Sequence, residues 1–260
     1  MRGRLLRAVD VTTVTDVFTA AALVPSPPVI VPELNGARST ETEPLRASAV
    51  VAARRLGSLA TRWTVVGVGD TEQTLSADSV GTFRGFGVDV RVGLSERAGG
   101  EPDPWMPLAA LIAGWLREQV AHSIEIEARI LAADTSPVYC AGLGAELRRD
   151  FDASSEPHGL LVVADGAATL TAKAPGSYDE RSLEFQDDLT AALRNGDCAA
   201  LEQLDPVVCL ELGVAGRAAY QVLAGVFDNG TDGRPECTTL YADAPFGVGY
   251  HVGFWMPGRN

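Results

Sequence analysis

Short apolar runs recur along the chain, separated by stretches whose apolar residues recur every three or four positions. Uninterrupted or alternating apolar runs are typical of strands, and they end where glycine and proline gather. We expect strands at residues 17–24, 63–68, 81–94 (a strand or a hairpin), 137–140, 159–164 and, as a pair, within 238–255. The Pro27-Pro28 pair stops the first strand, because proline donates no hydrogen bond to a ladder.

Helical spacing is clearest where Leu108, Leu111 and Trp115 fall on one face. Pro44 suits the first turn of another helix, because the N–H group there has no partner within the helix. We expect helices at residues 44–62, 108–120, 122–133, 143–151, 180–195 and 207–226.

The alternation of strands and helices predicts an α/β fold with a mainly parallel or mixed central sheet and helices on both faces. In such sheets, ligands bind beyond the carboxyl ends of the strands. The segments after Val24, Val68 and Ala164 are therefore where we look for chemistry. We expect one domain over residues 17–260, preceded by a polar extension at residues 1–16.

Composition narrows the function classes. The 260 residues include 34 acidic and 21 basic side chains, a net charge of −13, so phosphate groups of nucleic acids and anionic membranes would be repelled. Every basic residue but Lys173 is arginine, a bias that we attribute to codon usage. The chain has no apolar run of about 18 residues, its basic start continues into polar residues, and none of its four cysteines form a C-x-x-C pair. These features favour a cytoplasmic protein with reduced thiols.

Common catalytic motifs are absent: there is no P-loop, no G-x-S-x-G and no H-E-x-x-H. Gly142-Leu143-Gly144 lacks the third glycine of a dinucleotide loop, so we interpret it as a tight turn. Of the three histidines, His122 and His158 are expected to be structural or solvated. His251 follows a glycine-rich segment and is a candidate pocket residue.

The segment from Leu23 to Leu34, with its Pro25-Ser26-Pro27-Pro28 core and Pro32-Glu33, resembles the first signature of the class III extradiol dioxygenase catalytic-subunit (LigB-like) superfamily. That family often has P-H-P-P at this point, and its histidine is an iron ligand. Ser26 stands in its place here. The segment Tyr241–Tyr250 resembles the family's closing Y-E-x-P-F-G-V-G-Y stretch, with Asp243 nearest to the glutamate.

Two weaker matches lie between these segments. Thr64–Asp70, followed by the glycine–phenylalanine stretch at 81–87, resembles the strand that ends in a second ligand histidine, with Asp70 in that place. Leu161–Leu170 resembles the strand that ends in S-G-D-x-S-H, so Thr169 takes the place of the serine and Leu170 that of an acid–base histidine. The resemblance covers roughly residues 17–256, and it also implies a homo-oligomer.

The family holds ferrous iron with two histidines and one carboxylate, and this chain lacks those histidines. We therefore expect a divergent member that has lost iron-dependent ring cleavage. It would bind a small aromatic or phenolic molecule, or a protein partner, in the cleft that corresponds to the family's active site. In an alternative, Asp70, Asp165 and Asp243 hold a divalent cation in a carboxylate-based metalloenzyme. In a third, the alignment is shifted and His251 contributes to an unfamiliar site. The candidate pocket residues are Ser26, Asp70, Asp165, Thr169, Asp243 and His251.

Overall fold

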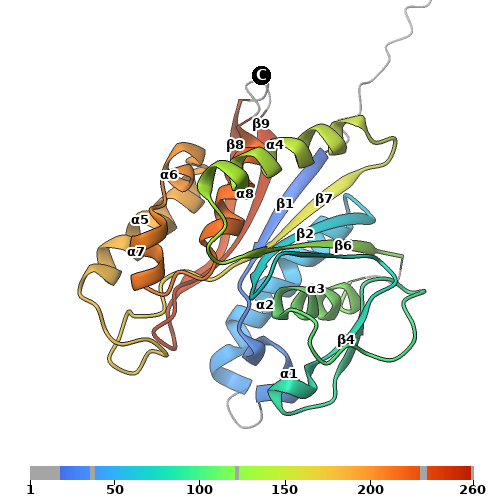
Figure 1. Ribbon diagram of the computed structural model, residues 1–260, viewed down its shortest axis with the longest axis horizontal. Helices are drawn as coiled ribbons and strands as arrows, with labels where there is room; N and C mark the ends of the chain where they lie inside the picture. The colour runs from blue at the N-terminus through green and yellow to red at the C-terminus, as the bar shows by residue number, and fades with distance from the viewer. Residues whose placement is uncertain (1–17, 36–38, 121–122, 229–232, 259–260) are drawn as a thin grey trace, which may run out of the picture.

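A seven-stranded sheet organises the protein in the computed structural model, which describes residues 18–35, 39–120, 123–228 and 233–258 (Figure 1). The strand order is β3-β6-β2-β7-β1-β9-β8, and β4 and β5 form a separate pair. The strands are β1 (Phe18–Val24), β2 (Arg62–Gly69), β3 (Gln73–Leu75), β4 (Val80–Thr82), β5 (Arg91–Gly93), β6 (Glu125–Ala132), β7 (His158–Val163), β8 (Gly233–Asp243) and β9 (Tyr250–Gly258).

The sheet is mixed. Strands β6, β2, β7 and β1 run parallel to one another, whereas β9 is antiparallel to β1, β8 to β9 and β3 to β6. The carboxyl ends of β1, β2, β6, β7 and β8 therefore meet at one edge of the sheet, together with the amino end of β9. This is the edge at which an α/β protein places its ligands.

Helices cover both faces of the sheet (Figure 1). They are α1 (Pro32–Asn35), α2 (Ser39–Gly57), α3 (Leu108–Glu118), α4 (Pro137–Ala153), α5 (Arg181–Asn195), α6 (Cys198–Glu202), α7 (Pro206–Glu211) and α8 (Arg217–Phe227). Alternate residues of β1 divide between two cores: Ala20 and Ala22 pack on the side of α2 and α3, and Ala21 and Leu23 pack on the side of α4, α5 and α8. The predicted α/β fold with helices on both faces is confirmed.

Strands β1, β2 and β7 lie where the apolar runs predicted them, and the predicted hairpin over 81–94 is the β4–β5 pair. The pair of strands at the carboxyl end is β8 and β9, while helices α3 and α5 also match their predictions. The helix predicted at 44–62 is α2, which begins five residues earlier, so Pro44 lies inside it.

Two predicted elements are wrong in type. The stretch predicted as a helix near 122–133 is strand β6, because Ile126, Ala128 and Ile130 are buried on alternate positions. The strand predicted at 137–140 is the first turn of α4, where the Ser136 hydroxyl accepts a hydrogen bond from the backbone N–H of Tyr139.

Glycines account for two more differences. The predicted helix at 207–226 is divided into α7 and α8 by a turn in which Gly213 adopts a left-handed φ of 66°. The tight turn expected at 142–144 is instead part of α4. A β-carbon at Gly144 would overlap the carbonyl oxygen of Val222 and lie 2.8 Å from the Cα of Gly225, so this glycine lets α4 and α8 approach closely.

No helix of the described residues is long and apolar enough to cross a membrane. The four cysteines all lie in the described part of the chain and are free thiols. The extension predicted at residues 1–16 and His122 lie outside the described residues.

Candidate ligand-binding site

Ser26 and Asp165 meet at the carboxyl edge of the sheet. Ser26 follows β1 and Asp165 follows β7, and these parallel neighbours are paired at Val24 and Val163. The Ser26 backbone N–H donates to Asp165 Oδ1 over 2.8 Å, and the Ser26 hydroxyl donates to Asp165 Oδ2 over 2.6 Å. Each carboxylate oxygen of Asp165 therefore accepts one hydrogen bond from Ser26.

Ser26 and Asp165 are both half-buried. Burial raises the pKa of the Asp165 carboxyl, although the two hydrogen bonds from Ser26 oppose the shift. Burial, together with the negative charge of Asp165, also raises the pKa values of the Tyr220 and Tyr250 phenols, which therefore stay neutral. The Tyr220 hydroxyl donates to the carbonyl of Ala164 over 3.0 Å.

Asp70 and Asp243 lie at the same edge of the sheet, and both are exposed. The Oδ1 of Asp243 accepts the backbone N–H of the next residue, Ala244, over 2.7 Å. Within the described ranges, no three His, Cys, Asp or Glu side chains form a group that could hold a metal ion. The structure therefore does not assemble Asp70, Asp165 and Asp243 into the carboxylate site that the sequence offered as an alternative.

Thr169 is buried in the loop after β7. Its hydroxyl lies 2.5 Å from the Ser182 hydroxyl and donates to the carbonyl of Leu212 over 3.1 Å. These contacts fix the loop to the start of α5 and to the turn after α7. Thr169 therefore has a structural role, and the expectation that it lines a pocket with Ser26 is corrected.

His251 is buried on β9, with 3% of its surface exposed. It shares a strand face with Trp255, whose indole N–H donates to the carbonyl of Leu193 in α5, so His251 lies on the α5 side of the sheet. Neither of its ring nitrogens has a hydrogen-bond partner among the described residues. Burial and, secondly, the charge of Arg194 lower its pKa to about 4. The interpretation of His251 as a pocket residue is corrected.

His158 fits its expected structural role. Its ring stacks on Phe151 with centroids 4.5 Å apart, and its Nε2 lies 3.1 Å from the Thr64 hydroxyl. Since His158 begins β7, it lies at the amino end of the parallel strands, away from the Ser26–Asp165 pair.

A cavity of about 970 Å³ opens beside the Ser26–Asp165 pair. Three loops surround it: the segment after β1, the segment after β7 and the β8–β9 connection. It is lined by Pro27, Pro28, Val29, Asn35, Thr171, Ala172, Lys173, Pro175, Ala244, Pro245, Phe246, Gly247, Val248 and Tyr250. We call this space the edge cavity. None of the six residues predicted for the pocket lines it, although Ser26 precedes Pro27 directly.

Two walls of the edge cavity, Pro27-Pro28 and Pro245–Val248, belong to the two segments that carry the resemblance, although none of their residues is among the candidate pocket residues. The third wall, Thr171–Pro175, lies outside both segments. The one sequence signal for that wall is Lys173, the single lysine of the chain.

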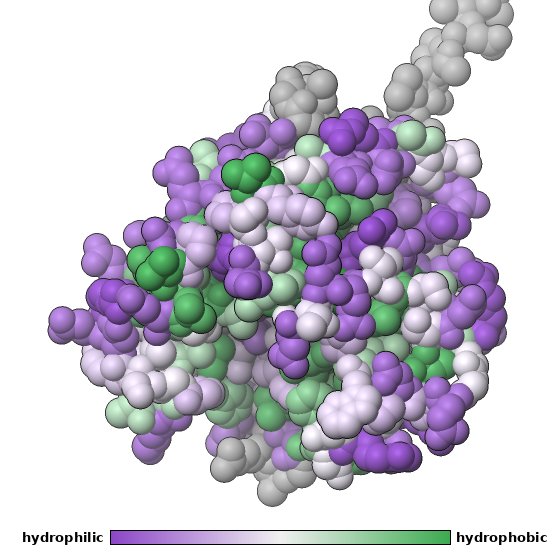
Figure 2. Space-filling model, viewed as in Figure 1, coloured by the Kyte–Doolittle hydropathy of each residue, from purple (hydrophilic) through white to green (hydrophobic). Residues whose placement is uncertain are grey.

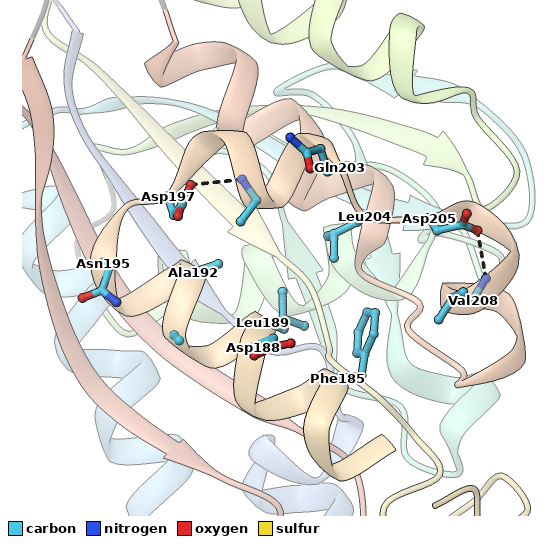
Figure 3. Close-up of a pocket in the computed structure, with 12 residues that line it drawn as sticks. Phe185, Asp188, Leu189, Ala192, Asn195, Asp197, Gln203, Leu204, Asp205 and Val208 are labelled. Carbon is cyan, nitrogen blue, oxygen red and sulfur yellow. Dashed lines mark hydrogen bonds between the residues drawn. The ribbon is translucent and has the colours of Figure 1, made fainter. Parts of the chain in front are cut away.

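A second cavity, of about 520 Å³, lies between α5, α6 and α7 (Figure 3). We call it the helix groove. Its apolar lining includes Phe185, Leu189 and Leu204, and its charged side chains are Asp188, Asp197 and Asp205. Leu183 in α5 and Val207 and Leu210 in α7 are exposed. Figure 2 shows hydrophobic surface on the side of the molecule where these helices lie.

The fold and site define an α/β protein with a mixed seven-stranded sheet and an apolar cavity at its carboxyl edge. No protein-family model matches the chain, and no curated protein sequence does. Among solved structures, it is similar to the crystal structure of the uncharacterized protein JW3007 from Escherichia coli K12, at 12% identity and a TM-score of 0.53. The match covers 92% of this chain and 99% of the other, and at this identity it shows the fold alone.

Proposed function

We propose that this chain is a divergent class III extradiol dioxygenase-like protein that lacks the iron centre and binds a small aromatic or phenolic compound in the edge cavity. The observation that carries the proposal is the position of that cavity. It lies between the two segments with the most specific resemblance, represented by Pro27-Pro28 on one side and Pro245-Phe246 on the other.

The lining suits an aromatic ring. Proline, valine and phenylalanine supply half of the lining residues, and the polar side chains are those of Asn35, Thr171, Lys173 and Tyr250. A cavity of about 970 Å³ falls within the range of about 300–1,000 Å³ that is usual for small-molecule sites. Flat apolar ligands gain most of their affinity from surfaces of this kind.

The donor atoms do not fit ferrous iron. Ser26, Asp70 and Leu170 occupy the positions where the resemblance places histidines, and leucine can neither bind a metal nor carry a proton. The Ser26 hydroxyl and both Asp165 oxygens are already joined to one another. These features support a binding role for the edge cavity and give no basis for ring cleavage there.

The test compares tryptophan substitutions in the two cavities. Ala172 lines the edge cavity and Ala200 lines the helix groove, and both are exposed alanines, so each can accept a larger side chain without disturbing a core. Binding of 2-naphthol, a neutral phenolic probe, is measured by titration calorimetry. We expect Ala172→Trp to weaken binding at least about tenfold, because the indole occupies the ligand volume, and Ala200→Trp to leave it unchanged.

Two results would count against the proposed function. One is an absence of 2-naphthol binding to the wild-type protein. The other is the reverse pattern, in which Ala200→Trp blocks the probe and Ala172→Trp does not. Thermal unfolding of both variants, expected at the wild-type temperature, checks that each is folded.

A further inference from the structure

The charge of the edge cavity is opposite to that of the protein. The chain carries a net charge of −13, and the helix groove shows the same sign, with three aspartates in its lining. Among the described residues that line the edge cavity there is no aspartate or glutamate, and Lys173 carries the one charged side chain. A cavity in so acidic a protein that presents a single cation is suited to an anion.

Lys173 is held at the cavity by a defined turn. The backbone N–H of Ala174 donates to the carbonyl of Thr171 over 3.0 Å, which closes the turn. The N–H of Leu170 donates to the carbonyl of Gly247 over 3.2 Å, which joins this turn to the β8–β9 connection. The lysine stem therefore starts from a backbone position that is tied to the wall containing Phe246.

Lys173 has no counter-ion within the molecule as far as the structure describes it: no ion pair with an acidic side chain of the described residues involves it. By contrast, Arg97 and Arg181 each bind two carboxylates. A cation on the wall of an apolar cavity without an internal partner is available to a ligand.

We propose that the ligand of the edge cavity is an apolar ring compound with one carboxylate, and that Lys173 binds this carboxylate. The inference rests on the proposed function and adds the charge class of the ligand. One ammonium group, with the Thr171 hydroxyl in the same cavity lining, matches a monoanion. A phosphate would need more charge, or the several backbone N–H donors that phosphate sites have.

The test uses two probes of equal shape, 2-naphthoate and 2-naphthamide, which differ in charge. For the wild-type protein we expect the dissociation constant of naphthoate to be about fivefold lower than that of naphthamide, the upper end for a solvent-accessible ion pair. We expect Lys173→Met to abolish this preference and Lys173→Arg to retain it. Added salt at 0.5 M should reduce the preference in the wild type, because it screens the pair.

The outcomes separate the two proposals. Equal binding of the acid and the amide to the wild type, or an unchanged preference in Lys173→Met, overturns the inference and leaves the proposed function standing. Failure of both probes and of 2-naphthol to bind overturns the proposed function, and the inference falls with it. Since Lys173 is exposed, neither variant is expected to change the unfolding temperature.

Discussion

The edge cavity and the helix groove differ in the contacts that their charged side chains make within the protein. In the helix groove, Asp197 accepts the N–H of Ala200 over 3.0 Å and Asp205 accepts that of Val208 over 3.1 Å, so two of the three carboxylates cap helices (Figure 3). The fold itself therefore explains them. In the edge cavity, no comparable contact of the described residues explains Lys173. A polar group with a structural task is weak support for a ligand site, and one without such a task is stronger.

The largest effect that we expect concerns His251, which lies on the sheet beneath α5, the helix that lines the groove with its other side. Its pKa in the folded state is about 4, below the ordinary value of 6.5, so the unfolded chain binds the proton more readily. The contribution of neutral His251 to the free energy of unfolding is therefore fully present above about pH 6.5. It is lost as the pH falls toward 4, which lowers the free energy of unfolding by up to about 3 kcal/mol.

Urea unfolding at pH 7 and pH 4.5 measures this loss. His251→Leu removes the titrating ring, so it should lose less stability than the wild type over the same interval. Because the pKa of His158 is also lowered by burial, some acid sensitivity should remain in both proteins. An identical loss in the wild type and in His251→Leu would show that His251 does not titrate with folding.

Two glycines with left-handed φ allow a matched comparison of the cavities. A β-carbon on Gly247, in the edge cavity, would overlap the Thr171 hydroxyl and stand 2.7 Å from the Ala174 β-carbon. One on Gly196, beside the helix groove, would stand 2.6 Å from the Pro235 ring. We expect either alanine variant to lose about 2 kcal/mol in chemical unfolding, from strain and overlap together.

The same two variants separate the cavities by their effect on binding. Gly247→Ala should also weaken 2-naphthol binding, because Gly247 lines the edge cavity and its β-carbon would displace the Thr171–Ala174 turn in the wall of that cavity, whereas Gly196→Ala should not. Equal binding by both variants would mean that the probe does not contact the edge cavity.

Asp205 provides a smaller test of the helix groove. Asp205→Ala removes the cap of α7, where one carboxylate oxygen accepts the N–H groups of Val207 and Val208, and should cost about 1 kcal/mol of stability. Naphthol binding should stay at the wild-type level in calorimetry. Weaker binding in this variant would assign a ligand role to the groove that we do not expect.

The smallest expected effect is that of Asp70→Ala combined with Asp243→Ala. Both carboxylates are exposed and do not join a metal-binding group of described residues, so the double variant should match the wild type in metal content after incubation with calcium, magnesium, manganese or ferrous iron. Mass-spectrometric metal analysis after dialysis measures this. A stoichiometric ion that the double variant loses would restore the metalloenzyme alternative.

Patterns in the sequence predicted the parallel core of the fold well. Continuous apolar runs mark β1, β2 and β7, because strands buried on both faces need no polar alternation. The rule that ligands lie at the carboxyl ends of such strands pointed to the segments after Val24 and Ala164, the resemblance singled out Ser26 in the first of them, and Ser26 and Asp165 do meet. Strand β6 was missed because its glutamates, arginine and alanine favour a helix, although its burial alternates as in a strand.

The site was harder to predict, because its details depend on side-chain direction and on loops. Tyr250 and His251 are adjacent on β9, and neighbouring residues of a strand point to opposite faces, so Tyr250 reaches the edge cavity while His251 lies under α5. Thr169 and Lys173 lie in one irregular loop, whose path follows from tertiary contacts such as the Thr169–Ser182 hydrogen bond. No periodic pattern encodes such a path.

The most direct test of the edge cavity as the ligand site is a set of intermolecular nuclear Overhauser effects between 2-naphthol and labelled valine methyl groups. Val29 and Val248 line the edge cavity, and Val208 lines the helix groove. We predict cross-peaks from the naphthol protons to Val29 and Val248 and none to Val208. Cross-peaks to Val208 without those to Val29 and Val248 would contradict the proposed site.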